Sequence, residues 1–281
     1  MNKISLAYTP FQHILWSFCL IVLFVLGGGD AEAGELSERL ANFPQWEKLT
    51  SVQPTSGDLI YPGWMAGTWQ VKSTLVDLAA PLAPDIVTPG FEGNRRQLNQ
   101  PVSFLVRFIK RSPFTGLKFL SRGDEKSAIL IADRAFNSLN LARAYLGDEA
   151  VLSVKVDPES PNRQITFLRS KCSEGRFCDR QLVSLVTARA TETTPDGKFI
   201  TTEVFQQLFK GGSHPYFNSV ESTTAYRQLS TSNPAIDADQ VTAVYLSPQD
   251  PDYFAAASRP VALYRYRLEF FPAELLATSK E

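Results

Sequence analysis

Alternation of apolar and polar side chains with a period of two is the feature that most constrains how this chain can fold. It is clearest near the C-terminus, where residues 262–270 place aliphatic and aromatic side chains on one face of a strand and mainly charged side chains on the other. Residues 101–109 repeat the alternation, with the apolar side chains from Val102 to Phe108 pointing one way. Both segments predict β-strands, because strand side chains alternate between two faces.

More segments rich in β-branched and aromatic residues precede or follow these two, and turn residues separate most of them. The strand candidates are residues 68–76, 117–121, 127–131, 151–156, 164–169, 182–191, 199–209, 220–229 and 240–246. We expect about nine or ten strands in an antiparallel sheet, because the chain lacks the strand–helix rhythm of a parallel one. A sheet of that size has to curl or split, and closure removes its edges. The prediction is an all-β fold with minor helix, an antiparallel up-and-down β-barrel of about 9–10 strands.

Two short helices and one irregular run interrupt the strands. Residues 36–40 and 132–146 favour helix, and Gly147 would end the second of them. The run 79–100 contains three prolines and two glycines, which is unusual for an ordinary connection. Long ordered loops of this kind are often lids or binding loops, so this run is a candidate contact surface.

The first 33 residues predict export. A single Lys3 precedes the apolar run 14–26, and three glycines and Ala31-Glu32-Ala33 follow. This order is typical of a secretory signal peptide, and the run is short for a membrane span. The alternative is an uncleaved membrane anchor. We therefore expect a signal peptide over 1–33, an N-terminal arm over 34–66, a single β-barrel domain over 67–272 and a C-terminal tail over 273–281.

The net charge argues against some classes of binding partner, and the cysteines bear on whether the chain carries a disulfide. The whole chain has 28 Lys and Arg against 29 Asp and Glu, and removal of residues 1–33 leaves a formally neutral chain. Neutrality argues against nucleic-acid binding and against a polybasic membrane role. Cys172 and Cys178 are the cysteines left after the signal, and in an oxidising compartment they predict a disulfide. A thiol redox pair or a metal site is the alternative, although the five-residue spacing does not match the usual motifs.

One short motif points to a type of barrel. Gly67-Thr68-Trp69 opens the predicted strand at 68–76. It resembles the GxW signature of the lipocalin and fatty-acid-binding-protein superfamily. The resemblance implies a lipocalin-like barrel in which Trp69 plugs the closed end and an arginine from the last strand, Arg265 or Arg267, lies over it. A guanidinium over an indole ring is a favourable arrangement.

A second resemblance covers nearly the whole chain after the signal. Its most distinctive segments are residues 75–85, 88–95, 133–137, 246–254 and 259–266. They resemble a family of uncharacterised proteins of cyanobacteria and chloroplasts. The resemblance implies a location in the thylakoid lumen or the periplasm, in agreement with the predicted signal, and it implies no activity.

The barrel interior is the first candidate site. Trp69 and the aromatic faces of the strands would give it an apolar wall with a few hydroxyl groups, which is typical of a small-molecule pocket. The predicted ligand-binding residues are Trp69, Phe104, Phe108, Tyr264 and Tyr266. We expect a small apolar ligand of the pigment, lipid, quinone or tetrapyrrole type. A narrower barrel would instead be filled by these same side chains.

Two alternatives involve other parts of the chain. In the first, the protein is a non-catalytic assembly or maintenance factor that docks on a photosynthetic membrane complex through the 79–100 loop, with Phe91, Glu92, Asn94 and Arg95 as contacts. In the second it is an enzyme on a barrel scaffold, for which His214, Asp133 and Arg95 would be the residues to test. The second is weaker, because the sequence contains neither GxSxG nor HExxH and only one histidine after the signal. No cofactor and no metal site is identified.

Overall fold

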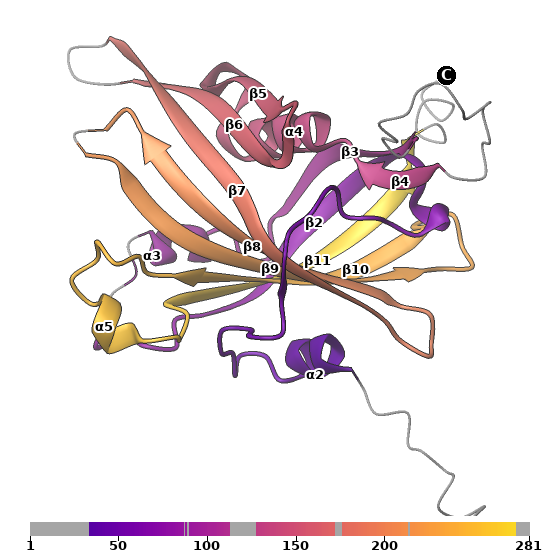
Figure 1. Cartoon of the computed structure of the whole chain (residues 1–281), viewed down its shortest axis with the longest axis horizontal. Helices are drawn as coiled ribbons and strands as arrows, with labels where there is room; N and C mark the ends of the chain where they lie inside the picture. Colours follow the sequence, from indigo (N-terminus) through magenta and orange to yellow (C-terminus); the bar gives the residue numbers. More distant parts are fainter. Residues whose placement is uncertain are drawn as a thin grey trace, which may run out of the picture. The chain divides into compact units, whose positions relative to one another are not determined.

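The strands form one continuous antiparallel sheet that curls into a barrel-like half-cylinder (Figure 1). The computed structural model describes residues 34–86, 88, 90–112, 128–171, 176–212 and 214–273, with the backbone alone at Lys171. All the helices and strands of this part lie within one compact unit, Glu35–Glu281. The all-β, antiparallel, barrel-like fold predicted from the alternation is confirmed.

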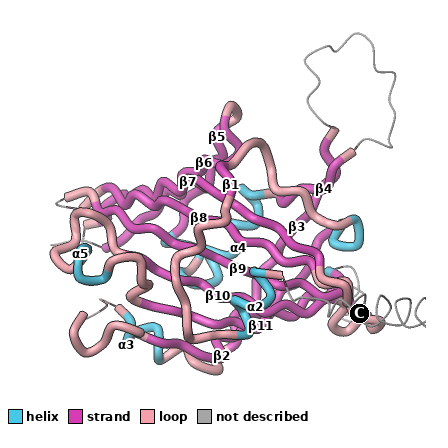
Figure 2. Tube along the Cα trace, turned by 60° about the horizontal axis from the view of Figure 1, so that its bottom comes forward, coloured by secondary structure: helices cyan, strands magenta, loops and turns pink. Residues whose placement is uncertain are grey.

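From one edge to the other the sheet runs β4 (Ile129–Ala132), β3 (Pro101–Arg111), β2 (Gly67–Ala79), β11 (Ala262–Pro272), β10 (Ile236–Tyr245), β9 (Tyr216–Gln228), β8 (Phe199–Lys210), β7 (Phe177–Thr193), β6 (Ser160–Lys171) and β5 (Val151–Asp157). Strands that follow one another in the sequence are neighbours in the sheet from β2 to β4 and from β5 to β11 (Figure 2). A two-residue strand, β1 (Gln53–Pro54), pairs with β7 beside a register shift between Val186 and Ala188. The strand candidate at 117–121 lies outside the described residues.

Pairing of β2 with β11 brings the two ends of the barrel domain together. Trp69 lies opposite Pro272, and Tyr264 lies opposite Leu78. The two outer strands of the sheet, β4 and β5, are not paired with each other within the described residues. The ring of hydrogen-bonded strands is therefore interrupted there.

Helix α4 (Arg134–Leu146) occupies this interruption. It packs against β3, which adjoins one edge of the sheet, and against β5, which is the other edge. The helix begins after Asp133, whose carboxylate accepts a hydrogen bond from the Phe136 amide at 3.2 Å. It ends at Gly147, whose φ of 87° is accessible to glycine and strained for most other residues. The predicted helix at 132–146 is thus confirmed, and it has a structural task that the sequence did not indicate.

The N-terminal arm covers the convex face of the sheet. Helix α2 (Glu35–Ala41) and the chain after it form an apolar cluster with β8, β10 and β11. An ion pair reinforces the contact, since Arg39 donates to both carboxylate oxygens of the buried Glu221 at 2.8 and 3.0 Å. Figure 1 shows α2 on one side of the sheet and α4 on the other.

The barrel has two ends with different coverings. At the end we call the η1 end, the short helix η1 (Gly63–Met65) packs into an aromatic cluster, and Met65 is fully buried. At the opposite end lie helix α3 (Phe91–Arg95), helix α5 (Tyr253–Ala256), the ends of β6 and β8 and the starts of β7 and β9. We call this the α5 end. The irregular run at 79–100 folds over part of it, because Phe91 is buried against Leu75, Ala262 and Tyr264.

Candidate functional site

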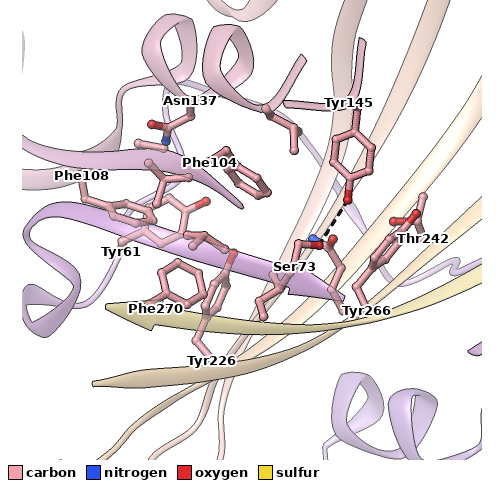
Figure 3. Close-up of a pocket in the computed structure, with 16 residues that line it drawn as sticks. Tyr61, Ser73, Phe104, Phe108, Asn137, Tyr145, Tyr226, Thr242, Tyr266 and Phe270 are labelled. Carbon is pink, nitrogen blue, oxygen red and sulfur yellow. Dashed lines mark hydrogen bonds between the residues drawn. The ribbon is translucent and has the colours of Figure 1, made fainter. Parts of the chain in front are cut away.

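A cavity of about 430 Å³ lies between the concave face of the sheet and helix α4 (Figure 3). Its wall comes from β2, β3, β4, β9, β10 and β11, from α4 and from Tyr61 of the N-terminal arm. The lining residues are Tyr61, Val71, Ser73, Phe104, Val106, Phe108, Ala132, Asn137, Leu141, Tyr145, Tyr226, Gln240, Thr242, Tyr266, Leu268 and Phe270. A cavity of this size is in the range of small-molecule sites.

The deep part of the cavity, toward the η1 end, is aromatic. The ring of Tyr61 meets the ring of Phe108 edge to face, with centroids 4.8 Å apart, and it also contacts Tyr226 at 6.3 Å. Burial raises the pKa of the Tyr226 hydroxyl to about 12, and it raises that of Tyr61 well above its usual range. Both hydroxyls are therefore neutral at physiological pH.

A group of uncharged polar side chains lines the other part of the cavity. The hydroxyls of Ser73 on β2 and Tyr145 on α4 are 3.3 Å apart, as the dashed line in Figure 3 shows. Gln240 donates to Thr224 at 2.9 Å, and Thr242 follows on the same face of β10. Burial, and then the neighbouring tyrosines, raise the pKa of Tyr266. The cavity thus combines an apolar wall with neutral hydrogen-bonding groups.

An ion cluster lies close to the deep part of the cavity without lining it. Arg134 at the start of α4 donates to Glu203 on β8 at 2.7 Å, and Arg189 on β7 donates to the same oxygen at 3.0 Å. Arg189 also donates to Asn162 at 2.6 Å. These three charged side chains are nearly buried, with 12 to 16% of each exposed. Because their charges pair with one another across α4, β7 and β8, we assign them a structural role.

The predicted ligand-binding residues divide into two groups. Phe104, Phe108 and Tyr266 line the cavity. Trp69 does not line it. It is buried in the cluster behind the aromatic wall's Phe108 and Phe270, and it donates its indole N–H to the Met65 carbonyl at 2.8 Å. Tyr264 lies on the same face of β11 as Tyr266, but α3 covers it.

The prediction that Arg265 or Arg267 lies over the ring of Trp69 is wrong. Trp69 belongs to the concave-face cluster, whereas Arg265 and Arg267 have the strand parity of the convex face. Arg265 instead donates to Asp239 at 2.9 and 2.5 Å, and its guanidinium lies 5.5 Å from the ring of Phe43. Arg267 approaches Glu269 at 3.6 Å. Alternation along β11 separates these arginines from the indole, since neighbouring positions face opposite sides.

Two of the four predicted loop contacts point into the protein. Phe91 is buried, and Asn94 donates to the Tyr264 hydroxyl at 3.0 Å. Glu92 and Arg95 form an exposed pair, with 2.9 Å between Arg95 Nε and Glu92 Oε2. The prolines and glycines of the 79–100 run therefore shape a cover for the barrel, and half of the proposed contact surface is unavailable.

The side chains that α4 contributes to the cavity were not predicted. Asn137, Leu141 and Tyr145 follow one another at intervals of four residues, which places them on one helix face. This spacing could have identified an inward face of the helix. Tyr61 and Tyr226 had no such signal, because nothing local in the sequence brings them together.

The residues considered for catalysis are not gathered at one place. Asp133 caps α4 and accepts from Arg107 at 2.5 Å, Arg95 pairs with Glu92, and His214 is exposed in the β8–β9 connection. In the part of the chain that the structure describes, no group of three or more His, Cys, Asp or Glu side chains could hold a metal ion. Cys172 lies outside the described residues, so its disulfide with Cys178 stays a prediction.

Comparison with known proteins gives one match. A family model described as "Domain of unknown function (DUF6816)" matches residues 54–274, which include every strand of the sheet except the first residue of β1. Comparisons with curated proteins and with solved structures find no match. Among the described residues, none of the helices has the length and the hydropathy needed to cross a bilayer.

Proposed function

The chain belongs to the DUF6816 family, and we propose that it binds a small, uncharged, largely apolar molecule in the cavity between its sheet and α4. The observation that supports this proposal most directly is the composition of the cavity wall. Aromatic and aliphatic side chains make up most of it, and a few neutral hydroxyl and amide groups meet at one part. This combination is what a site for a small apolar molecule with one polar end requires.

The absence of charge in the described wall narrows the class of ligand. The described residues that line the cavity include no Asp, Glu, Lys or Arg. A buried ionised group without a partner is costly, so a ligand with free carboxylates would bind poorly. A hydroxyl, ester or carbonyl group could instead exchange hydrogen bonds with Ser73, Tyr145 or Thr242. Of the four ligand types expected from the sequence, neutral lipids, quinones and uncharged pigments fit better than a tetrapyrrole acid.

Native mass spectrometry of the protein isolated from its own host tests the proposal. We expect an additional mass that organic solvent releases and that corresponds to an uncharged apolar compound. The variant Val106→Phe adds a ring to the cavity wall and should lower the amount of bound compound at least tenfold.

The matched control is Val76→Phe, because Val76 is exposed away from this cavity, on β2. It should retain the compound as the unchanged protein does. The proposal fails if the host protein carries no small molecule, or if Val106→Phe and Val76→Phe retain equal amounts of it while both remain folded.

The assembly-factor alternative has less support. Its contact loop would have to present Phe91 and Asn94 to a partner, and both are engaged with the barrel. Glu92 and Arg95 remain at the surface, but an exposed pair of this kind is common on protein surfaces.

The proposed location follows from the N-terminal residues and from the resemblance to cyanobacterial and chloroplast proteins. We propose export to a thylakoid lumen or a periplasm, with cleavage before Gly34. The intact mass of the protein recovered from its host should then correspond to a chain that begins at Gly34. A mass that includes residues 1–33 would contradict cleavage and favour a retained anchor.

A further inference from the structure

Exposed aromatic side chains gather at the α5 end of the barrel. The start of β7, the end of β8 and the start of β9 reach this end together (Figure 1). Phe177 begins β7, and Phe209 near the end of β8 pairs with Tyr216 at the start of β9. Phe177 is 61% exposed, and Phe209, Tyr216 and Phe217 are 37 to 42% exposed. By strand parity Phe209 and Tyr216 share one face of the sheet and Phe217 the other, so aromatic rings are exposed on both sides of these strand ends. Several large aromatic side chains near water are unusual for a surface without a partner.

The ligand cavity faces the same end. Helix α4 runs away from β4 and the η1 end, so Tyr145 in its last turn lies toward the α5 end. Figure 3 shows Tyr145 with Thr242 at one part of the cavity and Phe108 with Tyr61 at the other. Leu141, Tyr145 and Leu146 are 41 to 56% exposed, so apolar surface continues outward from the cavity along α4.

Basic residues accompany these aromatics. Segments 169–180 and 209–217 contain five Lys and Arg residues against two Asp and Glu, although the whole chain has a formal charge of −1. Arg180 and Lys210 are exposed beside Phe177 and Phe209. Charges of both signs occur elsewhere at this end, with Asp252 and Arg259 on either side of α5. Asp250 lies close enough to Tyr216 to raise the pKa of its hydroxyl, after the larger effect of burial. The net charge of the chain thus conceals a local excess of positive charge.

We propose that the described ends of β7, β8 and β9 dock on the surface of an anionic lipid bilayer. The docking surface consists of Phe177, Arg180, Phe209, Lys210, Tyr216 and Phe217. Aromatic rings enter the headgroup region and basic side chains attract lipid phosphates, so the two kinds of residue match the two layers of a bilayer surface. The inference deepens the proposed function and rests on it in one respect: docking would place the cavity next to a reservoir of apolar ligand.

Vesicle flotation of the Glu35–Glu281 unit, which contains all the described strands and helices, tests the docking. One set of vesicles is phosphatidylcholine alone, and the other contains added phosphatidylglycerol. We expect tighter binding to the second set and a loss of this preference in high salt. Phe177→Ser combined with Phe217→Ser should weaken binding at least tenfold. Arg180→Glu combined with Lys210→Glu should weaken binding to the anionic vesicles about fivefold or more for each residue.

Matched controls lie away from the α5 end. Ile60→Ser removes a 54% exposed apolar side chain near the η1 end, and Lys110→Glu reverses an exposed charge on β3. Both should bind vesicles as the unchanged protein does. Circular dichroism confirms that every variant is folded.

Three results would overturn the proposal. The first is that the protein floats with neither kind of vesicle, and the second is that the control variants lose as much binding as the docking-surface variants. The third is a dimer, seen by sedimentation, that the serine variants dissociate. The last result would assign the surface to a second copy of the chain. Native mass spectrometry separates this inference from the proposed function, because a ligand-free protein that still binds anionic vesicles refutes only ligand binding.

Discussion

At the residue scale, the structure depends on a small number of polar side chains buried with their partners. Glu221 on the convex face is the clearest example, since its side chain is 1% exposed. It accepts hydrogen bonds from Arg39 and from the Tyr245 hydroxyl, the latter at 3.1 Å. The carboxylate raises the pKa of Tyr245 further, after the larger effect of burial. A buried charge of this kind is tolerated only because its partners remain in place.

Replacement of Glu221 by Ala should therefore lower the free energy of unfolding by about 3–5 kcal/mol, because Arg39 is left buried without its counter-charge. Urea denaturation measures the change. The control is Glu92→Ala, which breaks an exposed pair and should cost about 0–1 kcal/mol. Equal losses in the two variants would show that the buried Arg39–Glu221 pair stabilises the fold no more than an exposed ion pair does.

The raised pKa of Tyr226 predicts how the free energy of unfolding changes at alkaline pH. Its pKa is raised to about 12 by burial, whereas a tyrosine in the unfolded chain has a pKa of about 10. Between these values the unfolded chain loses the proton and the folded chain keeps it. The free energy of unfolding should therefore fall above pH 10, by up to about 1.4 kcal/mol per pH unit for this one group.

Denaturation at pH 8, 10 and 11 tests this expectation with Tyr226→Phe as the comparison. The variant should lose less stability than the unchanged protein on going from pH 8 to pH 11. The other buried tyrosines titrate in both proteins, so only the difference between them reports on Tyr226. Parallel curves would contradict the assignment.

At the element scale, α4 decides whether the molecule has a site. The helix fills the interruption between the two edges of the sheet, and its face with Asn137, Leu141 and Tyr145 forms one wall of the cavity. Two contacts hold its first turn: Asp133 caps the helix and pairs with Arg107, and Arg134 pairs with Glu203. The position of the helix, and so the shape of the cavity, depends on these anchors.

Asp133→Ala should destabilise the protein by about 1–2 kcal/mol, because it removes a helix cap together with a partly exposed ion pair. Asp133→Asn keeps a capping oxygen and should cost less. Asp148→Ala, at an 88% exposed carboxylate just beyond the end of α4, serves as the control and should change stability by less than about 0.5 kcal/mol. If Asn cost as much as Ala, the cap would not be the main contribution.

At the scale of the whole molecule, the sheet is curled but not closed by strand pairing in its described part. Strands β4 and β5 are its edges, and α4 and the N-terminal arm protect the two faces. An edge strand has hydrogen-bonding groups on one side that no neighbouring strand protects. The central strands have partners on both sides and the most buried side chains.

Hydrogen exchange should follow this arrangement. Amides of β4 and β5 should exchange faster than those of β2, β10 and β11, because local opening at an edge breaks fewer contacts. Exchange followed by mass spectrometry on peptides from these strands measures the difference. Uniform protection over all of them would indicate that the sheet opens only as a whole.

Much of the fold could be predicted from local pattern. The alternation at 262–270 corresponds to β11, the similar pattern at 101–109 corresponds to β3, and the helical composition at 132–146 corresponds to α4. Local pattern sufficed there because a strand or helix that buries one face has apolar residues at the period of its own secondary structure. Phe104, Phe108 and Tyr266 were placed on the cavity for the same reason.

The errors concern relations between segments. Arg265 was expected over Trp69, but Arg265 and Trp69 lie on opposite faces of the neighbouring strands β11 and β2. Arg265 pairs instead with Asp239, which shares its face of the sheet. Phe91 was expected at a contact surface and is buried instead. Periodicity within one segment does not show which helix or loop packs over which strand. That packing depends on side chains from positions far apart in the sequence.

The sequence by itself determined the class of fold, the approximate strands and the apolar face of the sheet, because those properties follow from periodicity within each segment. Only the tertiary structure decided that α4 stands between the sheet edges and that Tyr61 and Tyr145 border one cavity. These are outcomes of packing between segments far apart in the chain, and packing is a property of the assembled three-dimensional molecule rather than of any local run of residues.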